Sequence, residues 1–182
     1  MLNRWKLMFL MVLTIITLVS CTGQAKMDPL IKAAMEGNSG EVEKLLRDGA
    51  EVNARNKDGN TALMWAAYKG HAGIVQVLLE HGAALDIQGN QGWTALMFAA
   101  ATGRTEIVRT MIKHGADINQ KNANGFTALM YAAMGDNKET VRLLIDHGAI
   151  VNAKNNDGET ASTLAEKEGC FDIVGLLEKD NT

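Results

Sequence analysis

Residues 61–67 read Thr-Ala-Leu-Met-Trp-Ala-Ala, and nearly the same seven residues return at 94–100 and at 127–133. Each return comes 33 residues later, and only the aromatic residue changes. One period before the first copy and one period after the last, residues 28–34 and 160–166 keep a weaker form of the pattern. A Gly-Ala pair has the same spacing, at Gly49-Ala50, Gly82-Ala83, Gly115-Ala116 and Gly148-Ala149. A fixed period of this length predicts an array of structural repeats.

Each period contains the pattern of two short helices. Thr61 can cap a first helix, and Gly70 is placed to end it. The second helix carries a single apolar stripe and is followed at once by Gly82. That stripe is formed by Ile74, Val75, Leu78 and Leu79. Helices of about 8–11 residues do not persist alone in water, so neighbouring units must bury each other's apolar stripes.

These features resemble the ankyrin repeat, whose 33-residue unit is a β-turn followed by two short antiparallel helices. The resemblance implies an all-α solenoid of five helix-turn-helix units with β-turn tips, over residues 28–180. The predicted units are 28–57, 58–90, 91–123, 124–156 and 157–180. The family's Thr-Pro-Leu-His is Thr-Ala-Leu-Met in three units here. Polar residues at stacking positions (Lys32 in the first unit, Glu166 and Glu178 in the last) predict that the array ends at five.

The first twenty residues have the pattern of an export signal. Arg4 and Lys6 precede an apolar run over 7–19, which is too short to span a bilayer as a helix. The run ends in Leu-Val-Ser-Cys at 18–21, which resembles the lipobox of bacterial lipoproteins. We therefore predict a signal peptide over 1–20, lipidation of Cys21 and a short tether over 21–27. Secretion as a soluble periplasmic protein is the alternative, and an uncleaved anchor is disfavoured by length.

The same resemblance places the protein on the periplasmic side of the envelope. Thr22 stands where an aspartate would retain a lipoprotein in the inner membrane, so the outer membrane is the expected location. If Cys21 carries lipid, Cys170 is the one cysteine left, so no internal disulfide can form. Cys170 is expected to fill a small space in the packing.

Composition and motifs argue against several function classes. The net formal charge is -3 with no long basic run, so we do not expect nucleic-acid binding. No known catalytic motif is present, and neither an enzyme activity nor a cofactor nor a small-molecule substrate is expected. Three of the four histidines recur with the period, too far apart to share a metal ion. The four are His71, His81, His114 and His147, of which the last three are periodic.

The resemblance implies that a protein partner meets the concave face, formed by the turn tips and the first helices. Trp93 and Phe126 occupy the same position in successive units and are candidate binding anchors. The alternative is that both rings pack down on the adjacent turn. A second aromatic set, Trp65, Phe98 and Tyr131, is expected to pack between units. The predicted partner-binding residues are Lys57, Asp58, Asn60, Tyr68, Lys69, Asn90, Gln91, Trp93, Thr102, Asn124, Phe126 and Met134.

The sequence thus predicts a non-catalytic protein–protein interaction module tethered to the bacterial envelope. Its overall pattern is similar to the small exported ankyrin-repeat lipoproteins of Gram-negative bacteria. That resemblance implies either support of a periplasmic antioxidant enzyme or an immunity protein that neutralises a toxin. A structural envelope spacer with no specific partner is a further alternative, and it predicts that Trp93 and Phe126 are dispensable.

Overall fold

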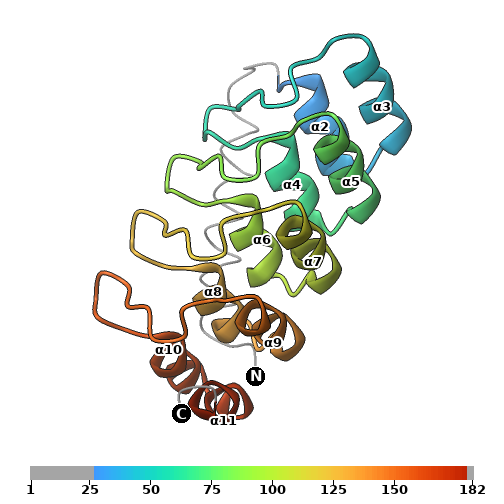
Figure 1. The fold of residues 1–182 in the computed structure, drawn as a ribbon. Helices are drawn as coiled ribbons and strands as arrows, with labels where there is room; N and C mark the ends of the chain where they lie inside the picture. Colours follow the sequence, from blue (N-terminus) through green and yellow to red (C-terminus); the bar gives the residue numbers. More distant parts are fainter. Residues whose placement is uncertain (1–26, 180–182) are drawn as a thin grey trace.

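The computed structural model describes residues 27–179 and shows a stack of helix pairs (Figure 1). The predicted signal peptide, Cys21 and most of the tether lie outside the described residues. Within that range there are ten α-helices and no strand, which confirms the all-α prediction. The helices are α2 (Pro29–Glu36), α3 (Ser39–Arg47), α4 (Ala62–Lys69), α5 (Ala72–Glu80), α6 (Ala95–Ala101), α7 (Thr105–Lys113), α8 (Ala128–Met134), α9 (Lys138–Asp146), α10 (Ala161–Glu168) and α11 (Phe171–Lys179).

The first helix of every unit begins at a capping side chain. Thr61, Thr94, Thr127 and Thr160 each accept a hydrogen bond from the backbone N–H three residues later. In the first unit Asp28 has this role, and Pro29 follows in the first helical position, where its missing N–H costs nothing. All five capped first helices therefore start in the same register, 33 residues apart.

The turn between the two helices needs a left-handed residue, and glycine usually supplies it. Gly70 adopts φ 85° and ends α4. The fourth unit is different, because Asp136 occupies the left-handed conformation there with φ 57°. Asp136 is the one non-glycine residue with positive φ among the described residues. Aspartate tolerates this conformation better than most residues, so the turn is kept at a modest cost.

The helices form two rows. First helices (α2, α4, α6, α8, α10) pack side by side, and each also packs against the second helix of its own unit. The paired alanines at 66/67, 99/100 and 132/133 are fully buried, and their small side chains let adjacent first helices approach closely. Second helices contribute Ile74, Val108 and Leu144 to the same continuous core. Neighbouring units therefore bury each other's apolar faces.

Four finger loops (residues 48–61, 81–94, 114–127 and 147–160) project to one side of the helices, as Figure 1 shows. Each tip is a β-turn closed by a backbone hydrogen bond, for example from Gly59 N to Asn56 O at 2.9 Å and from Gly125 N to Asn122 O at 2.9 Å. The side chain of Asn122 also accepts from the N–H groups of Asn124 and Phe126. These local bonds hold each tip in one conformation.

Adjacent fingers are joined by hydrogen bonds that repeat with the period. Asn53 Oδ1 accepts from Ala84 N at 2.9 Å, and Asn119 Oδ1 accepts from Ile150 N at the same distance two units later. Gln88 Nε2 donates to the carbonyl of Lys121 at 2.8 Å. The fingers therefore form a continuous layer rather than four independent loops.

The two ends of the stack are polar where the middle units are apolar. Lys32, Glu166 and Glu178 are all exposed. Glu166 and Glu178 stand one period after Ala133, which is buried, and Ile145, which is half-buried. Cys170 is buried and forms no disulfide within residues 27–179. None of the helices in residues 27–179 has the length and apolar character needed to cross a bilayer.

Candidate interaction face

Six aromatic side chains form one continuous row across the second, third and fourth units. Consecutive ring centroids lie 6.2, 6.1, 4.8, 4.1 and 5.3 Å apart. Four of these distances are in the range of favourable aromatic pairs, and the Trp93–Tyr131 pair is closer still. We call this the aromatic row, and it consists in order of Trp65, Tyr68, Phe98, Trp93, Tyr131 and Phe126. The structure describes seven aromatic residues, and six of them are in this row.

Local structure explains how the rings meet. Trp93 and Phe126 close the finger hairpins, where their carbonyls accept from Gly89 N and Asn122 N at 3.0 Å. Five residues later, Phe98 and Tyr131 lie on the first helix of the same unit. Each finger ring therefore packs on the helix ring of its own unit, and Trp93 additionally reaches Tyr131 of the next unit at 4.1 Å. This last contact joins units three and four.

The rings differ in exposure. Trp65 and Tyr131 are buried, with 7% and 6% of their surface exposed, whereas the other four rings are half-buried. Tyr131 Oη accepts a hydrogen bond from Asn122 Nδ2 at 2.7 Å. Burial raises the pKa of Tyr131 far above its usual value, and the Asn122 bond opposes that shift. Trp65 Nε1 is buried and has no hydrogen-bond partner among the described residues.

The two sequence predictions for the aromatic residues therefore merge. The sequence predicts Trp93 and Phe126 either as exposed binding anchors or as rings packed on the adjacent turn. It predicts that Trp65, Phe98 and Tyr131 pack between units. The structure shows half-buried finger rings resting on the helix rings, so one surface contains both sets. The signal for this was present in the sequence, because both finger rings precede a helix ring by five residues.

Ten of the predicted partner-binding residues reach the surface at least in part, and two do not. Lys57, Lys69, Asn90, Gln91 and Asn124 are exposed, whereas Asp58, Tyr68, Trp93, Thr102 and Phe126 are half-buried. Asn60 and Met134 are buried, at 8% and 7% exposure. Asn60 lies against Gly89 of the next finger, and Met134 packs into the core at the end of α8. Both are therefore removed from the candidate face.

One end of the aromatic row is positively charged. Lys69 Nζ lies 5.4 Å from the Tyr68 ring centroid, a cation–π distance. Burial raises the pKa of Tyr68, and the nearby Arg104 guanidinium partly offsets the shift. At the other end Glu159 pairs with Lys167, which lowers the pKa of the Glu159 carboxyl. Lys69 and Arg104 therefore make the Tyr68 end positive.

The periodic histidines have a structural role. Nδ1 of His81, His114 and His147 lies 2.8–2.9 Å from the carbonyl oxygen four residues earlier, at the ends of α5, α7 and α9. Because the carbonyl only accepts, Nδ1 carries the proton in this contact. No cluster of three or more metal-ligating side chains occurs in residues 27–179.

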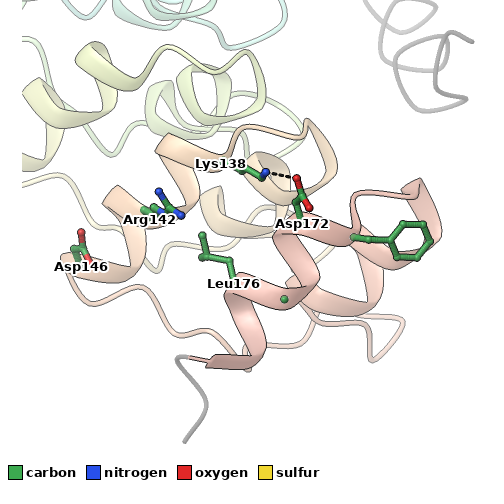
Figure 2. Close-up of a pocket in the computed structure, with 7 residues that line it drawn as sticks. Lys138, Arg142, Asp146, Asp172 and Leu176 are labelled. Atoms are coloured by element: carbon green, nitrogen blue, oxygen red, sulfur yellow. Dashed lines mark hydrogen bonds and ion pairs between the residues drawn. The ribbon is translucent and has the colours of Figure 1, made fainter.

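A second surface feature was not predicted from the sequence. A groove of about 560 Å³ lies between α9 and α11, and Lys138, Arg142 and Leu176 line it (Figure 2). Lys138 forms an ion pair with Asp172 across the groove, which lowers the pKa of that carboxyl. Gly175 opens the groove, because it stands where Arg142 stands one unit earlier. A glycine at this periodic position is the sequence feature from which the groove could have been predicted.

Stacked helix pairs with a layer of finger loops and a rigid aromatic face define the class of repeat proteins that present an extended binding surface. A family model described as ankyrin repeats (3 copies) matches residues 30–122 and again residues 118–182. The chain therefore belongs to the ankyrin-repeat family. Such repeats generally act as protein–protein interaction modules without catalysis. A search of curated proteins finds no match to the chain.

Proposed function

We propose that this chain is an envelope-tethered interaction module, held on the periplasmic side by a lipid on Cys21, and that it binds a partner protein through its concave face. The observation that carries the binding proposal is the aromatic row, which gathers six of the seven described aromatic residues on one face. Ankyrin repeats as a family imply a protein partner, and the row indicates where on this chain that partner is bound.

Rigidity supports this assignment. Four half-buried rings, held in one row by contacts that include the buried Tyr131, offer apolar surface while losing little conformational freedom when a partner covers them. Tryptophan is among the residues most enriched at binding hot spots, and Trp93 lies in the middle of the row. Exposed polar side chains at the finger tips, such as Gln91 and Asn124, would form the rim around it.

The tether would keep the domain near the bilayer. Residues 22–27 span at most about 20 Å when fully extended, so a partner should lie at or close to the membrane. Export and lipidation rest on the pattern at 1–21, and outer-membrane placement rests on Thr22. Replacing Cys21 with serine tests the anchor: labelled palmitate should no longer be incorporated, and the protein should leave the membrane fraction. Unchanged labelling would refute it.

Capture of a partner from solubilised envelopes tests the binding site. Full-length protein should retain a set of envelope proteins that the double variant Trp93→Ala/Phe126→Ala loses. Phe171→Ala is the matched control, since Phe171 is the one described aromatic residue outside the row and is 70% exposed. Circular dichroism must show that the double variant is folded. Retention of every captured protein by the folded double variant contradicts the proposed site and favours the envelope-spacer alternative.

A further inference from the structure

We infer that the aromatic row binds a proline-rich segment in the polyproline II conformation, with acidic residues at the end that meets Lys69 and Arg104. This inference rests on the proposed function and specifies the partner's chemistry. It uses three observations: the composition of the row, its course across three units, and its charged end.

The composition of the row suits such a segment. Polyproline II segments dock on surfaces lined by aromatic rings, because the proline rings pack flat on them and the helix is already formed before binding. Tyr68, Phe98 and Trp93 are half-buried and in sequential contact, and Tyr131 links Trp93 to the half-buried Phe126, so the rings provide a continuous surface of this kind. The backbone of a polyproline II segment has no internal hydrogen bonds, and the exposed amides of Gln91 and Asn124 can donate to its carbonyls.

The spacing of the units matches the same conformation. Adjacent first helices of a stack lie about 8–10 Å apart. One turn of polyproline II contains three residues and advances about 9 Å, so it presents the same face to each successive unit. An extended β-strand presents side chains to the same face every two residues, about 6.6–6.8 Å. This distance is shorter than the spacing of the units, so a strand would no longer match their positions within two units. The row crosses units two to four, so a segment of about nine residues would cover it.

The positive side chains beside Tyr68 set the direction in which the segment binds and its preference for acidic residues. Lys69 and Arg104 are exposed beside Tyr68, and neither forms a salt bridge with any residue between 27 and 179. At the opposite end Lys167 is paired with Glu159, and Lys121 Nζ already donates to the carbonyl of Lys154. An acidic group on the partner would therefore find its most favourable site at the Tyr68 end, where two cations lie close to one ring.

Synthetic peptides test the inference directly. The probes are oligoproline peptides of about nine residues that carry two aspartates at the N-terminus, at the C-terminus, or at neither end, with a matched peptide carrying two lysines. Binding to the full-length protein is followed by isothermal titration calorimetry and by tryptophan fluorescence. One aspartate-bearing peptide should bind at least about tenfold more tightly than the lysine-bearing peptide.

Two double variants separate the contribution of the aromatic rings to peptide binding from that of the charged side chains. Trp93→Ala/Phe126→Ala should weaken all oligoproline peptides by about tenfold or more. Lys69→Glu/Arg104→Glu changes only exposed side chains, and it should remove the preference for aspartate while leaving plain oligoproline binding intact. Phe171→Ala should change neither.

The inference is overturned if no oligoproline peptide binds, if aspartate and lysine peptides bind alike, or if soluble cell-wall glycans or a helical peptide bind the row instead. Its failure is distinguishable from failure of the proposed function. Envelope proteins that depend on Trp93 and Phe126 would still be captured if the row binds a partner of another chemistry. If capture is also independent of both residues, the proposed binding site is wrong as well.

Discussion

The glycines at 92 and 175 have different physical roles. Gly92 has φ 77°, and a side chain there would place its Cβ 2.6 Å from the backbone nitrogen of Ala123 in the next finger. Gly175 lies inside α11, where an added Cβ would meet nothing within 4 Å. Neither backbone conformation nor packing requires glycine at 175, whereas both require it at 92.

Replacing these two glycines with alanine should therefore have opposite effects. Gly175→Ala should raise the free energy of unfolding by about 0.5–1 kcal/mol, because alanine loses less backbone entropy in a helix. Gly92→Ala should lower it by more than about 1 kcal/mol, because of the left-handed conformation and the clash. Urea unfolding of the two variants beside the parent protein measures both. A destabilised Gly175→Ala protein would contradict the open space seen around α11.

Tyr131 predicts a pH dependence at the residue scale. Burial raises the pKa of its phenol, so the folded state keeps a proton that the unfolded chain releases above about pH 10. Its contribution to stability is fully present below about pH 10 and is lost as pH rises further. The stability advantage of the parent over Tyr131→Phe should therefore shrink by about 1 kcal/mol between pH 9 and pH 11, measured by urea unfolding.

The comparison with Tyr131→Phe contains its own control. Tyr68, whose pKa is also raised, is present in both proteins and cancels in the difference. Near neutral pH the variant should be less stable by about 1 kcal/mol, since Asn122 loses the phenol as its acceptor. Parallel pH profiles for the two proteins would show that the Tyr131 phenol ionises freely in the folded state.

At the scale of elements, the finger loops are held to one another by a series of side-chain bonds with one gap. Asn90 Nδ2 donates to Lys57 O and Asn156 Nδ2 donates to Ala123 O, both at 3.0 Å. Ala123 occupies the equivalent position between them but has no amide to donate. The backbone N–H of Ala123 nevertheless donates to Gln91 O at 3.1 Å. The backbone N–H groups of Asn90 and Asn156 donate to the preceding finger in the same way. The backbone is thus already in the bonding position.

The variant Ala123→Asn should complete the series by donating to Asn90 O. We expect a gain of about 0.5 kcal/mol, at the low end for a net hydrogen bond because the position is exposed. Asn156→Ala, which removes an existing bond of the same kind, should cost a similar amount. Urea midpoints of the two single variants test the pair. Loss of stability in Ala123→Asn would mean that the amide cannot reach Asn90.

For the whole molecule, the polar residues at the C-terminal end are expected to stop the stacking. Ala133 is buried and Ile145 half-buried, whereas their counterparts Glu166 and Glu178 are exposed. Because every unit presents a similar apolar flank to its neighbour, we expect side chains such as these to prevent another molecule from adding to the stack.

The double variant Glu166→Ala/Glu178→Ile should therefore self-associate. Sedimentation velocity at two protein concentrations should show a concentration-dependent dimer that the parent protein does not form. The control Glu43→Ala/Glu139→Ala removes two exposed carboxylates away from that end and should remain like the parent. A monomeric Glu166→Ala/Glu178→Ile protein would show that charge at these positions does not terminate the array.

The sequence alone determined the repeat, the order of the helices and the places where they begin and end. Capping threonines, left-handed glycines and paired alanines act locally or between immediate neighbours, so a 33-residue period carries their positions from one unit to the next. Asp136 departed from this expectation, because the turn fixes a backbone conformation rather than a residue type.

The tertiary structure alone decided which side chains share a surface. Trp93 and Tyr131 are separated by 38 positions, and they meet only because one finger lies over the first helix of the following unit. The same packing buries Asn60 and Met134, which the sequence assigned to the binding face. Periodicity specifies what each unit contains, whereas exposure depends on how far each unit covers the next, and that depends on side-chain volumes and contacts across the stack.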